Sequence, residues 1–393
     1  MVDQVSDSQA LAHHQSLLAL IRQRIDAAEG ALSFDSFMEL ALYAPGLGYY
    51  VAGLPKLGPT GDFVTAPEIS PLFAGCLAAQ CSDVFTALGG GDLLEFGAGS
   101  GVLAADLLAE LARQQRLPGQ YLILEPSPDL QARQRATLAA RVPGQAHRVR
   151  WLTALPSHFQ GVVIANEVLD AMPVHRFCID SQGAPEEVFV SFDEQDQALT
   201  EVTGPARSLG LQQAVLLLQS RGLALEPGYC SEINLRLAPW MRALARAMDR
   251  ALVLLIDYGY PRKEYYHRQR GAGTLISHHQ HRANTDPFQR LGLQDISAHV
   301  DFSAVADAGR AAGFDLAGYT NQANFLIGCG LDQRMMEALA AAADPALQMR
   351  ISAGARQLVL PAAMGERFQV LGLARGFNHP CRGFAVRDLR GRL

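Results

Sequence analysis

The chain has 393 residues, of which 49% are hydrophobic and 18% are charged, and its formal net charge is −6. This length predicts two to three domain units or one elaborated α/β domain, and the apolar fraction excludes a wholly disordered chain. The slightly acidic balance argues against a broad nucleic-acid-binding surface. The six cysteines are scattered and form no C-x-x-C motif. That pattern argues against a disulfide framework or a zinc cluster and favours a reducing compartment.

The first 14 residues contain two acids, and no lysine or arginine precedes Arg22, so the start of the chain lacks the marks of a signal peptide or a transit peptide. Apolar runs such as Ala251–Ile256 are far shorter than the ~20 residues that cross a bilayer. We therefore expect a cytoplasmic protein without a membrane span.

The N-terminal region predicts helices and one long loop. Apolar residues recur at helical spacing over Leu11–Ala28, and Ser33 is placed to cap a second helix over Phe34–Tyr43. A loop rich in glycine and proline follows over residues 46–71. Its embedded apolar residues favour an ordered loop, although a loop of this length is usually either functional or disordered. A further helix is expected over Pro71–Leu88.

Strands and helices alternate from residue 92 onward. This alternation predicts a parallel sheet that is covered by helices on both faces. Helices are expected from the loop after Phe96 to about Gln115 and over Asp129–Arg141. The expected strands are Asp92–Phe96, Gln120–Leu124, Val149–Leu152, Gly161–Ala165 and Ala251–Ile256.

An insertion of about 75 residues, roughly Val174–Met248, separates the last two of these strands. Its first part predicts antiparallel strands at Phe177–Ile179 and Glu187–Phe192, and the remainder predicts a helix, a strand at Cys230–Ile233 and another helix. The chain is thereby divided into four parts. These are an N-terminal helical and loop region (1–71), a first core part (72–173), the insertion (174–248) and a second core part (249–393).

The segment Leu93-Leu-Glu95-Phe-Gly97-Ala-Gly99-Ser-Gly101 carries the clearest chemical signature. A strand, a glycine turn and a helix start form a nucleotide-binding corner, where backbone approaches the ligand without an intervening Cβ. The dinucleotide fingerprint needs glycine where Val102 stands, so the pattern indicates S-adenosylmethionine (SAM) instead. Glu95 precedes the turn, and Glu125 ends the next strand, where a carboxylate can accept hydrogen bonds from two ribose hydroxyls. The alternative is a generic turn.

The segment Asn166-Glu167-Val-Leu-Asp170-Ala-Met-Pro173 follows the fourth strand, at the sheet edge where ligands bind. Asn166 is counted with the cofactor site, and its amide or backbone oxygen could also orient a nucleophile. Glu167 and Asp170 are catalytic candidates because paired carboxylates match the planar fork of a guanidinium. The alternative is a helix start that is capped by Asp170.

The loop Gly61-Asp62-Phe-Val-Thr65-Ala-Pro-Glu68-Ile-Ser70 offers polar groups on a frame set by glycine and proline. Asp62, Thr65 and Glu68 are candidates for a lid that contacts the substrate. Helix capping is the equally open alternative for such residues.

A histidine-rich stretch follows the fifth strand. His278, His279 and His281 suggest a metal site, but they lack the supporting carboxylates and spacing of one, so we expect a solvated loop and no metal. Asp295, His299 and Asp301 are candidates for the substrate entrance. Capping of the next helix is the alternative for Asp301.

Five separated motifs occur together and in order: those at 61–70, 94–101 and 166–174, then Asp257-Tyr-Gly-Tyr260 and Gln294-Asp-Ile-Ser-Ala-His-Val-Asp-Phe302. On these motifs the chain resembles the MidA-like family of class I SAM-dependent methyltransferases, from about Phe34 to the C-terminus. The resemblance implies an α/β, Rossmann-like fold with a seven-stranded mixed sheet, in which Phe368–Leu373 is a late strand. It also implies that SAM is bound by Gly97, Gly99, Gly101 and Glu125.

The same resemblance implies protein arginine N-methylation. Mitochondrial family members act in the assembly of respiratory complex I (NADH:ubiquinone oxidoreductase), so the implied product is a symmetrically dimethylated arginine in a complex I subunit or a similar protein. Glu167 and Asp170 match, by position, the acids that hold the guanidinium, and a homodimer is one open oligomeric state. Ser277-His278 departs from the Cys-Tyr that members often carry, which concerns the entrance rather than the cofactor.

Two other functions stay open on the sequence. One is a SAM-binding assembly chaperone with little turnover, and the other is a small-molecule methyltransferase. The insertion and the long N-terminal region favour a large substrate over a small one.

Overall fold

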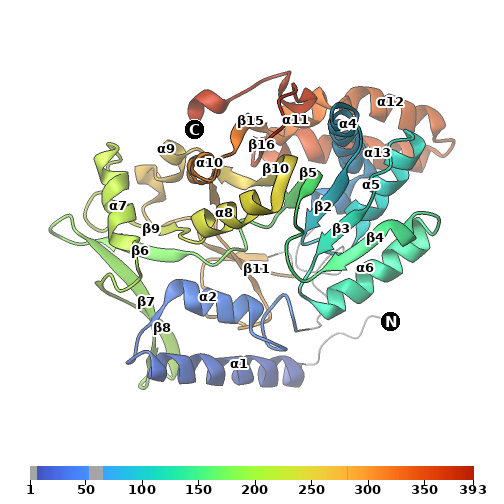
Figure 1. Ribbon diagram of the computed structural model, residues 1–393. Coiled ribbons are helices and arrows are strands. Elements are labelled where there is room, and N and C mark those ends of the chain that lie inside the picture. Colours follow the sequence, from blue (N-terminus) through green and yellow to red (C-terminus); the bar gives the residue numbers. More distant parts are fainter. Residues whose placement is uncertain (1–6, 53–64, 281) are drawn as a thin grey trace.

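The computed structural model describes residues 7–52, 65–280 and 282–393, and a twisted eight-stranded sheet forms its centre (Figure 1). The strand order is β15-β16-β10-β5-β2-β3-β4, with the short β14 paired to β10. Strands β10, β5, β2, β3 and β4 run parallel, whereas β16 runs antiparallel to both of its neighbours. The bounds are β2 (Asp92–Phe96), β3 (Tyr121–Leu124), β4 (Val149–Leu152), β5 (Phe159–Asn166), β10 (Met248–Tyr260), β14 (Val300–Asp301), β15 (Asp315–Asn321) and β16 (Phe368–Arg375).

The mixed sheet confirms the predicted fold class. All five strands expected from the alternation are present, and the late strand expected at Phe368–Leu373 is β16. Strand β10 is longer than predicted because it continues past the buried run Ala251–Ile256 through Asp257-Tyr-Gly-Tyr260. That extension carries a recognised motif directly to the carboxyl edge of the sheet.

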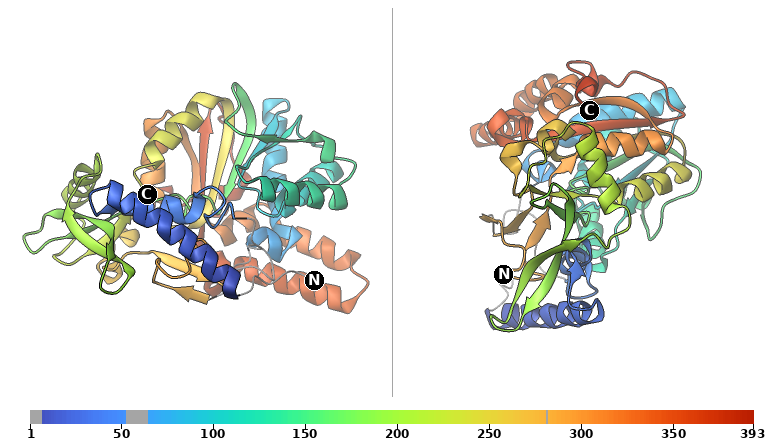
Figure 2. Two further views of the ribbon diagram at one scale, coloured as in Figure 1. Left: turned by 90° about the horizontal axis from the view of Figure 1, so that it is seen from below. Right: turned by 90° about the vertical axis from the view of Figure 1, so that its left-hand side faces the viewer.

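Helices cover both faces of the sheet, because successive strand residues point to opposite sides (Figure 2). Leu93 belongs to the core on one face and Leu94 to the core on the other. The first face is packed by α4 (Pro71–Leu88), α5 (Val102–Arg113), α6 (Pro128–Arg141), α11 (Gln322–Gly328), α12 (Leu331–Ala341) and α13 (Pro345–Val359). The second face is packed by α8 (Leu237–Ala247) and α10 (Phe302–Ala311).

Helix α4 is the one helix within the described ranges that is long and apolar enough, by length and composition, to cross a membrane. Sixty-seven per cent of its length is buried inside the fold. Leu77 and Cys81 on this helix pack into the core of the first face. A single helix of this kind is weak evidence for a membrane span, and its packing is that of a core helix.

The insertion forms a second, antiparallel sheet that also holds the N-terminal helices. Its order is β1-β7-β6-β9, with β8 paired to β7, and β1 reaches it from the N-terminal region. Leu17, Phe37 and Val190 share one apolar cluster, so the N-terminal helices pack on this sheet. The bounds are α1 (Asp7–Ala27), β1 (Leu32–Ser33), α2 (Phe34–Tyr43), β6 (His175–Ile179), β7 (Pro185–Asp193), β8 (Ala198–Pro205), α7 (Leu211–Ser220) and β9 (Cys230–Ile233).

The predicted strands of the insertion are confirmed as β6, β7 and β9, whereas β1 and β8 were not predicted. The long loop expected at 46–71 ends in a short helix, α3 (Ala66–Ile69), and residues 53–64 lie outside the described ranges. Another short helix, α9 (Arg262–Tyr265), follows β10. The four-part division of the chain stays a prediction.

The histidine-rich stretch is a three-stranded sheet and not the solvated loop that we expected. Strand β11 (Ile276–His279) pairs with β12 (Arg282–Asn284) on one side and with β13 (Asp295–Ser297) on the other. Ser277 and Ile296 pair across this sheet and are both buried. The polar side chains of β11 led us to predict a loop, although one face of this strand is packed in the fold. Among the described residues no group of three metal-ligand side chains is found, and His281 lies outside them.

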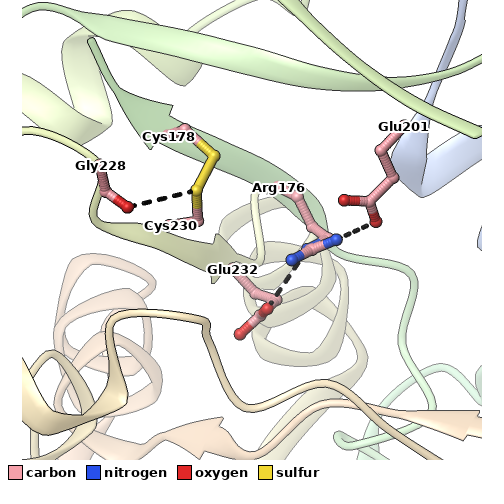
Figure 3. Close-up of a disulfide and its surroundings, with 6 residues drawn as sticks. All are labelled: Arg176, Cys178, Glu201, Gly228, Cys230 and Glu232. Carbon is pink, nitrogen blue, oxygen red and sulfur yellow. Dashed lines mark hydrogen bonds and ion pairs between the residues drawn. A yellow bond between two sulfur atoms is a disulfide. The ribbon is translucent and has the colours of Figure 1, made fainter. Parts of the chain in front are cut away.

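Cys178 of β6 and Cys230 of β9 form a disulfide (Figure 3). The sequence argued against a disulfide framework, and this one pair departs from that expectation. The two cysteines are 52 residues apart, and they meet because β6 and β9 place them at directly paired positions. Sheet pairing therefore created a contact that the spacing of the cysteines did not indicate. The other four cysteines are free and buried.

Candidate active site

The predicted glycine turn lies between β2 and α5. Gly97, Gly99 and Gly101 have φ angles of +59°, +52° and +82°, a left-handed region that glycine enters at no steric cost. A Cβ on Gly101 would also lie 3.0 Å from Cα of Gln134. The turn therefore needs glycine both for its conformation and for its packing against α6.

The turn opens into a first cavity of about 280 Å³. Its walls come from the carboxyl ends of β2, β3 and β5, from the N-terminal region and from α3. The cavity is lined by the predicted cofactor residues Glu95, Gly97, Gly99, Glu125 and Asn166 and by Tyr43, Tyr50, Thr65, Glu68 and Glu167. The structure thus gathers one site from five separate segments of the chain.

Glu125 directly follows β3, and both of its carboxylate oxygens accept hydrogen bonds that hold it in place. The backbone N–H of Ser127 donates to Oε1 at 3.0 Å, and Nε2 of Gln134 donates to Oε2 at 3.1 Å. Gln134 also donates to the carbonyl oxygen of Gly99 at 3.1 Å and accepts from the indole N–H of Trp151 at 2.8 Å. This fully buried glutamine links the glycine turn to Glu125, and nothing in the sequence marked it.

Glu95 lies below the turn, where its carboxylate accepts the hydroxyl of Tyr121 at 2.6 Å. The pKa of Glu95 is raised to about 7. Burial is the largest cause, the Tyr121 hydrogen bond acts against it, and the charge of Glu125 adds to it. Its hydrogen-bond partner lies on the adjacent strand, so this side chain fastens β2 to β3 as well as lining the cavity.

Asp257 organises the backbone of the Asn166–Asp170 loop. Its buried Oδ2 accepts the backbone N–H groups of Val168, Leu169 and Asp170 at 3.2, 3.0 and 3.2 Å. A single carboxylate therefore replaces the partners that this short turn lacks. The Asp257 motif was recognised in the sequence, but this role of the side chain was not.

Glu167 has a φ of +55°, which is uncommon for a residue with a Cβ. The strained position is held by the backbone N–H, which donates to the carbonyl oxygen of Ile256 at 2.9 Å. Nδ2 of Asn166 donates to its carboxylate at 3.1 Å. Burial raises the pKa of Glu167 to about 8, and the charge of Asp170 adds to the effect.

A second cavity of about 430 Å³ meets the first at Glu167 and Tyr50, which line both. Asp170 and Asp295 join Glu167 in its lining. Its other walls are mostly rings and include one arginine: Tyr258, Tyr260, His278, His299, Phe368 and Arg367. Three carboxylates and a set of aromatic rings suit a cationic, planar ligand.

Two of the three acids of the second cavity are oriented by tyrosines. The hydroxyl of Tyr258 donates to Oδ2 of Asp170, and the hydroxyl of Tyr50 donates to Oδ1 of Asp295 at 2.9 Å. Burial raises the pKa of Asp170 to about 6. Tyrosine hydroxyls thus fix these two aspartates before any ligand is bound. The sequence analysis named Asp295 as an entrance candidate, whereas Tyr50 was not predicted.

The remaining predicted residues fall in different places. Thr65 and Glu68 line the first cavity, and the hydroxyl of Ser100 donates to Glu68. His299 lines the second cavity. Asp301 lies outside the linings of both cavities and caps α10, where its Oδ1 accepts the N–H groups of Ser303 and Ala304 at 3.0 and 3.1 Å. Asp62 lies outside the described residues.

Comparison with known proteins agrees with this geometry. Residues 76–320 match the family model of S-adenosyl-L-methionine-dependent methyltransferases called Methyltransf_28. The chain belongs to this family. A solved structure from Burkholderia thailandensis, bound to S-adenosyl-homocysteine, is 41% identical, covers 99% of this chain and 100% of its own, and superposes with a TM-score of 0.92. The chain is thus a SAM-dependent methyltransferase with a class I fold.

Curated relatives are more distant. The protein arginine methyltransferase NDUFAF7 of Danio rerio mitochondria is 28% identical, and the match covers 92% of this chain and 88% of the relative. The human mitochondrial protein of the same name is 27% identical over 88% of this chain and 80% of its own length. The similarity therefore extends over nearly the whole chain, well beyond the part that matches the family model.

Proposed function

We propose that the protein transfers a methyl group from SAM to a guanidinium nitrogen of an arginine side chain in a protein substrate, such as a subunit of respiratory complex I. The observation that carries this proposal is the second cavity. Three carboxylates line it, and one of them, Glu167, also lines the first cavity. The names of the mitochondrial relatives support the same chemistry. Symmetric dimethylation is the product pattern that we expect.

The first cavity fits SAM. The glycine turn exposes backbone to the ligand, and a Cβ on Gly97 would find only the side chain of Val168 nearby. Oδ1 of Asn166 is buried and has no hydrogen-bond partner among the described residues, so a ligand can supply one. We assign the ribose hydroxyls to Glu125 and the amino-acid end of the cofactor to the glycine turn and Asn166.

SAM, when bound, supplies a methyl group activated by its positive sulfur. The chain contributes alignment and electrostatics. A bound guanidinium favours the ionised forms of Glu167 and Asp170, because its positive charge lowers their raised pKa values. The two carboxylates then hold the guanidinium and draw its positive charge toward themselves, which leaves the opposite nitrogen more nucleophilic. As the new nitrogen–carbon bond forms, the carbon–sulfur bond breaks and its electron pair remains on sulfur. The nitrogen then loses one proton, which a carboxylate of this cavity can accept.

Substitution of Glu167 by glutamine tests the assignment. Glu167→Gln should retain affinity for S-adenosyl-homocysteine and lose about 100-fold in kcat/KM for the arginine substrate, because a hydrogen bond to a charged group contributes up to about 3 kcal/mol. Glu226→Gln, at an exposed position of the insertion, is the matched control and should leave both quantities unchanged. Full activity of Glu167→Gln would remove Glu167 from the mechanism.

The substrate class is tested by incubating the protein with isotope-labelled SAM and a cell lysate and then locating the label by mass spectrometry. Label on arginine side chains supports the proposal. Label on a small molecule alone would instead assign a small-molecule methyltransferase. Tight cofactor binding without any transferred label would favour an assembly chaperone.

A further inference from the structure

The Thr274 hydroxyl connects the insertion to the wall of the second cavity. It donates to Oε2 of Glu232 at 3.0 Å and accepts the backbone N–H of His299 at 3.2 Å. The hydroxyl of Tyr265 is a third partner at 3.2 Å. A threonine hydroxyl has one hydrogen to donate and two lone pairs, so all of its capacity is used in one place.

Glu232 belongs to β9 of the insertion and is fully buried. Its Oε2 also accepts the backbone N–H of Thr274 at 2.8 Å. Gly273, the residue before Thr274, has a φ of +86°, and a Cβ at Gly273 would lie 2.1 Å from Oε1 of Glu232. The turn at Gly273 is therefore shaped to let this carboxylate reach the Thr274 backbone.

Arg176 compensates the buried charge of Glu232. It lies between Glu232 and Glu201, so three strands of the insertion contribute to one ionic row (Figure 3). The Nε atom of Arg176 is 3.5 Å from Oε1 of Glu232. A buried carboxylate is costly without such a partner, and this arrangement keeps Glu232 in place as a rigid acceptor.

His299 lines the second cavity and also a small cavity of about 40 Å³ whose lining includes Glu232. The rings of Tyr258 and Tyr260 pack against the imidazole, with centroids 5.2 and 5.3 Å away. Burial lowers the pKa of His299 to about 4, so the imidazole is neutral and can accept a hydrogen bond from a cation without repelling it.

We propose that Glu232 and Thr274 are positioning residues, which hold the His299 imidazole in the wall of the second cavity so that it accepts a hydrogen bond from the guanidinium of the substrate. The insertion thereby sets the affinity for substrate without contributing to the cofactor site. This inference rests on the proposed arginine specificity, and it adds a recognition element that is separate from the carboxylates.

Two variants of Thr274 test the link. In protein saturated with S-adenosyl-homocysteine, Thr274→Val should weaken binding of the probe methylguanidine about tenfold, the effect of about one lost hydrogen bond. Affinity for S-adenosyl-homocysteine should stay within twofold, and Thr274→Ser should restore methylguanidine binding. Thr320→Val, at another buried threonine, on β15, is the matched control. Equal losses for both ligands in Thr274→Val, or no rescue by serine, would overturn the proposal.

A spectroscopic measurement separates this inference from the substrate assignment. In protein labelled with ¹⁵N-histidine, the ring signals of His299, assigned with a His299→Gln variant, should shift in Thr274→Val and return in Thr274→Ser. If methylguanidine fails to bind even the unmodified protein, the arginine assignment fails. The ring signals then decide the positioning role alone, and unshifted signals in Thr274→Val would refute it.

Discussion

Two effects change the pKa of Glu95 in opposite directions: burial raises it, and the hydrogen bond from Tyr121 lowers it. Sequence placed Glu95 in the cofactor site, and the structure shows that its carboxylate also accepts the Tyr121 hydroxyl inside the sheet. Burial is the larger effect, and it holds the pKa of Glu95 near 7. A group with a raised pKa in the folded state stabilises the fold below its unfolded pKa, and this stabilisation is lost as the pH rises through the folded value.

Replacing Glu95 with glutamine should therefore change the pH dependence of stability. In cofactor-free protein, the free energy of unfolding of Glu95→Gln relative to the original chain should rise by up to about 3 kcal/mol between pH 4 and pH 8, since one pKa unit corresponds to 1.36 kcal/mol. Urea unfolding at several pH values measures this difference. Glu226→Gln serves as the exposed control, and a difference for Glu95→Gln that does not vary with pH would contradict the assigned burial effect.

At the scale of elements, the glycine turn and α6 act as one unit through Gln134. Gly89 and Gly101 both have left-handed φ angles of +75° and +82°, but only Gly101 has backbone within reach of an added Cβ. Alanine at either position should cost about 1–2 kcal/mol of stability. Only Gly101→Ala should also weaken S-adenosyl-homocysteine binding, by at least about tenfold, because displaced Gln134 releases Glu125. Calorimetric titration and urea unfolding of both variants test this, and equal affinities would refute the coupling.

Elements with buried apolar runs could be predicted from sequence, and those built on pairing could not. Ala251 to Ile256 is an apolar run, and Leu93 to Phe96 is apolar apart from Glu95; both predicted central strands. The outward-facing side chains of β8 and the histidines of β11 resemble loop residues, and only pairing with β7 or β13 makes them strands. The disulfide was not predicted for the same reason, because only the pairing of β6 with β9 brings Cys178 and Cys230 together.

The candidate site divides in a similar way. Residues at strand ends, such as Glu125 and Glu167, were identified because they follow strands at the carboxyl edge of a parallel sheet. Gln134, Asp257 and Thr274 act on backbone atoms that are distant in sequence, and residue type alone does not reveal such partners. Asp301 shows the reverse case, since its motif was recognised but its side chain caps α10.

At the scale of the whole molecule, the segment that matches the family model is smaller than the folding unit. Residues 76–320 omit β16, which lies between β10 and β15, and they omit Tyr43 and Tyr50 from the cavity walls. A fragment of these residues should show neither cooperative unfolding nor S-adenosyl-homocysteine binding, whereas the full chain shows both. Circular dichroism and calorimetric titration compare the two. Native-like cofactor binding by the fragment would mean that β16 is dispensable.

The position of β16 also governs the order in which the sheet is completed during synthesis. Strand β10 ends at residue 260, and its antiparallel partner begins at residue 368. At 5–20 residues per second, ribosomes need roughly 5–20 s to make the intervening chain. Throughout that interval one long edge of β10 has no partner, and unpaired strand edges are the sites where nascent chains associate wrongly. The central strands can therefore assemble early, but the nascent chain depends on protection of that edge until its last strand emerges.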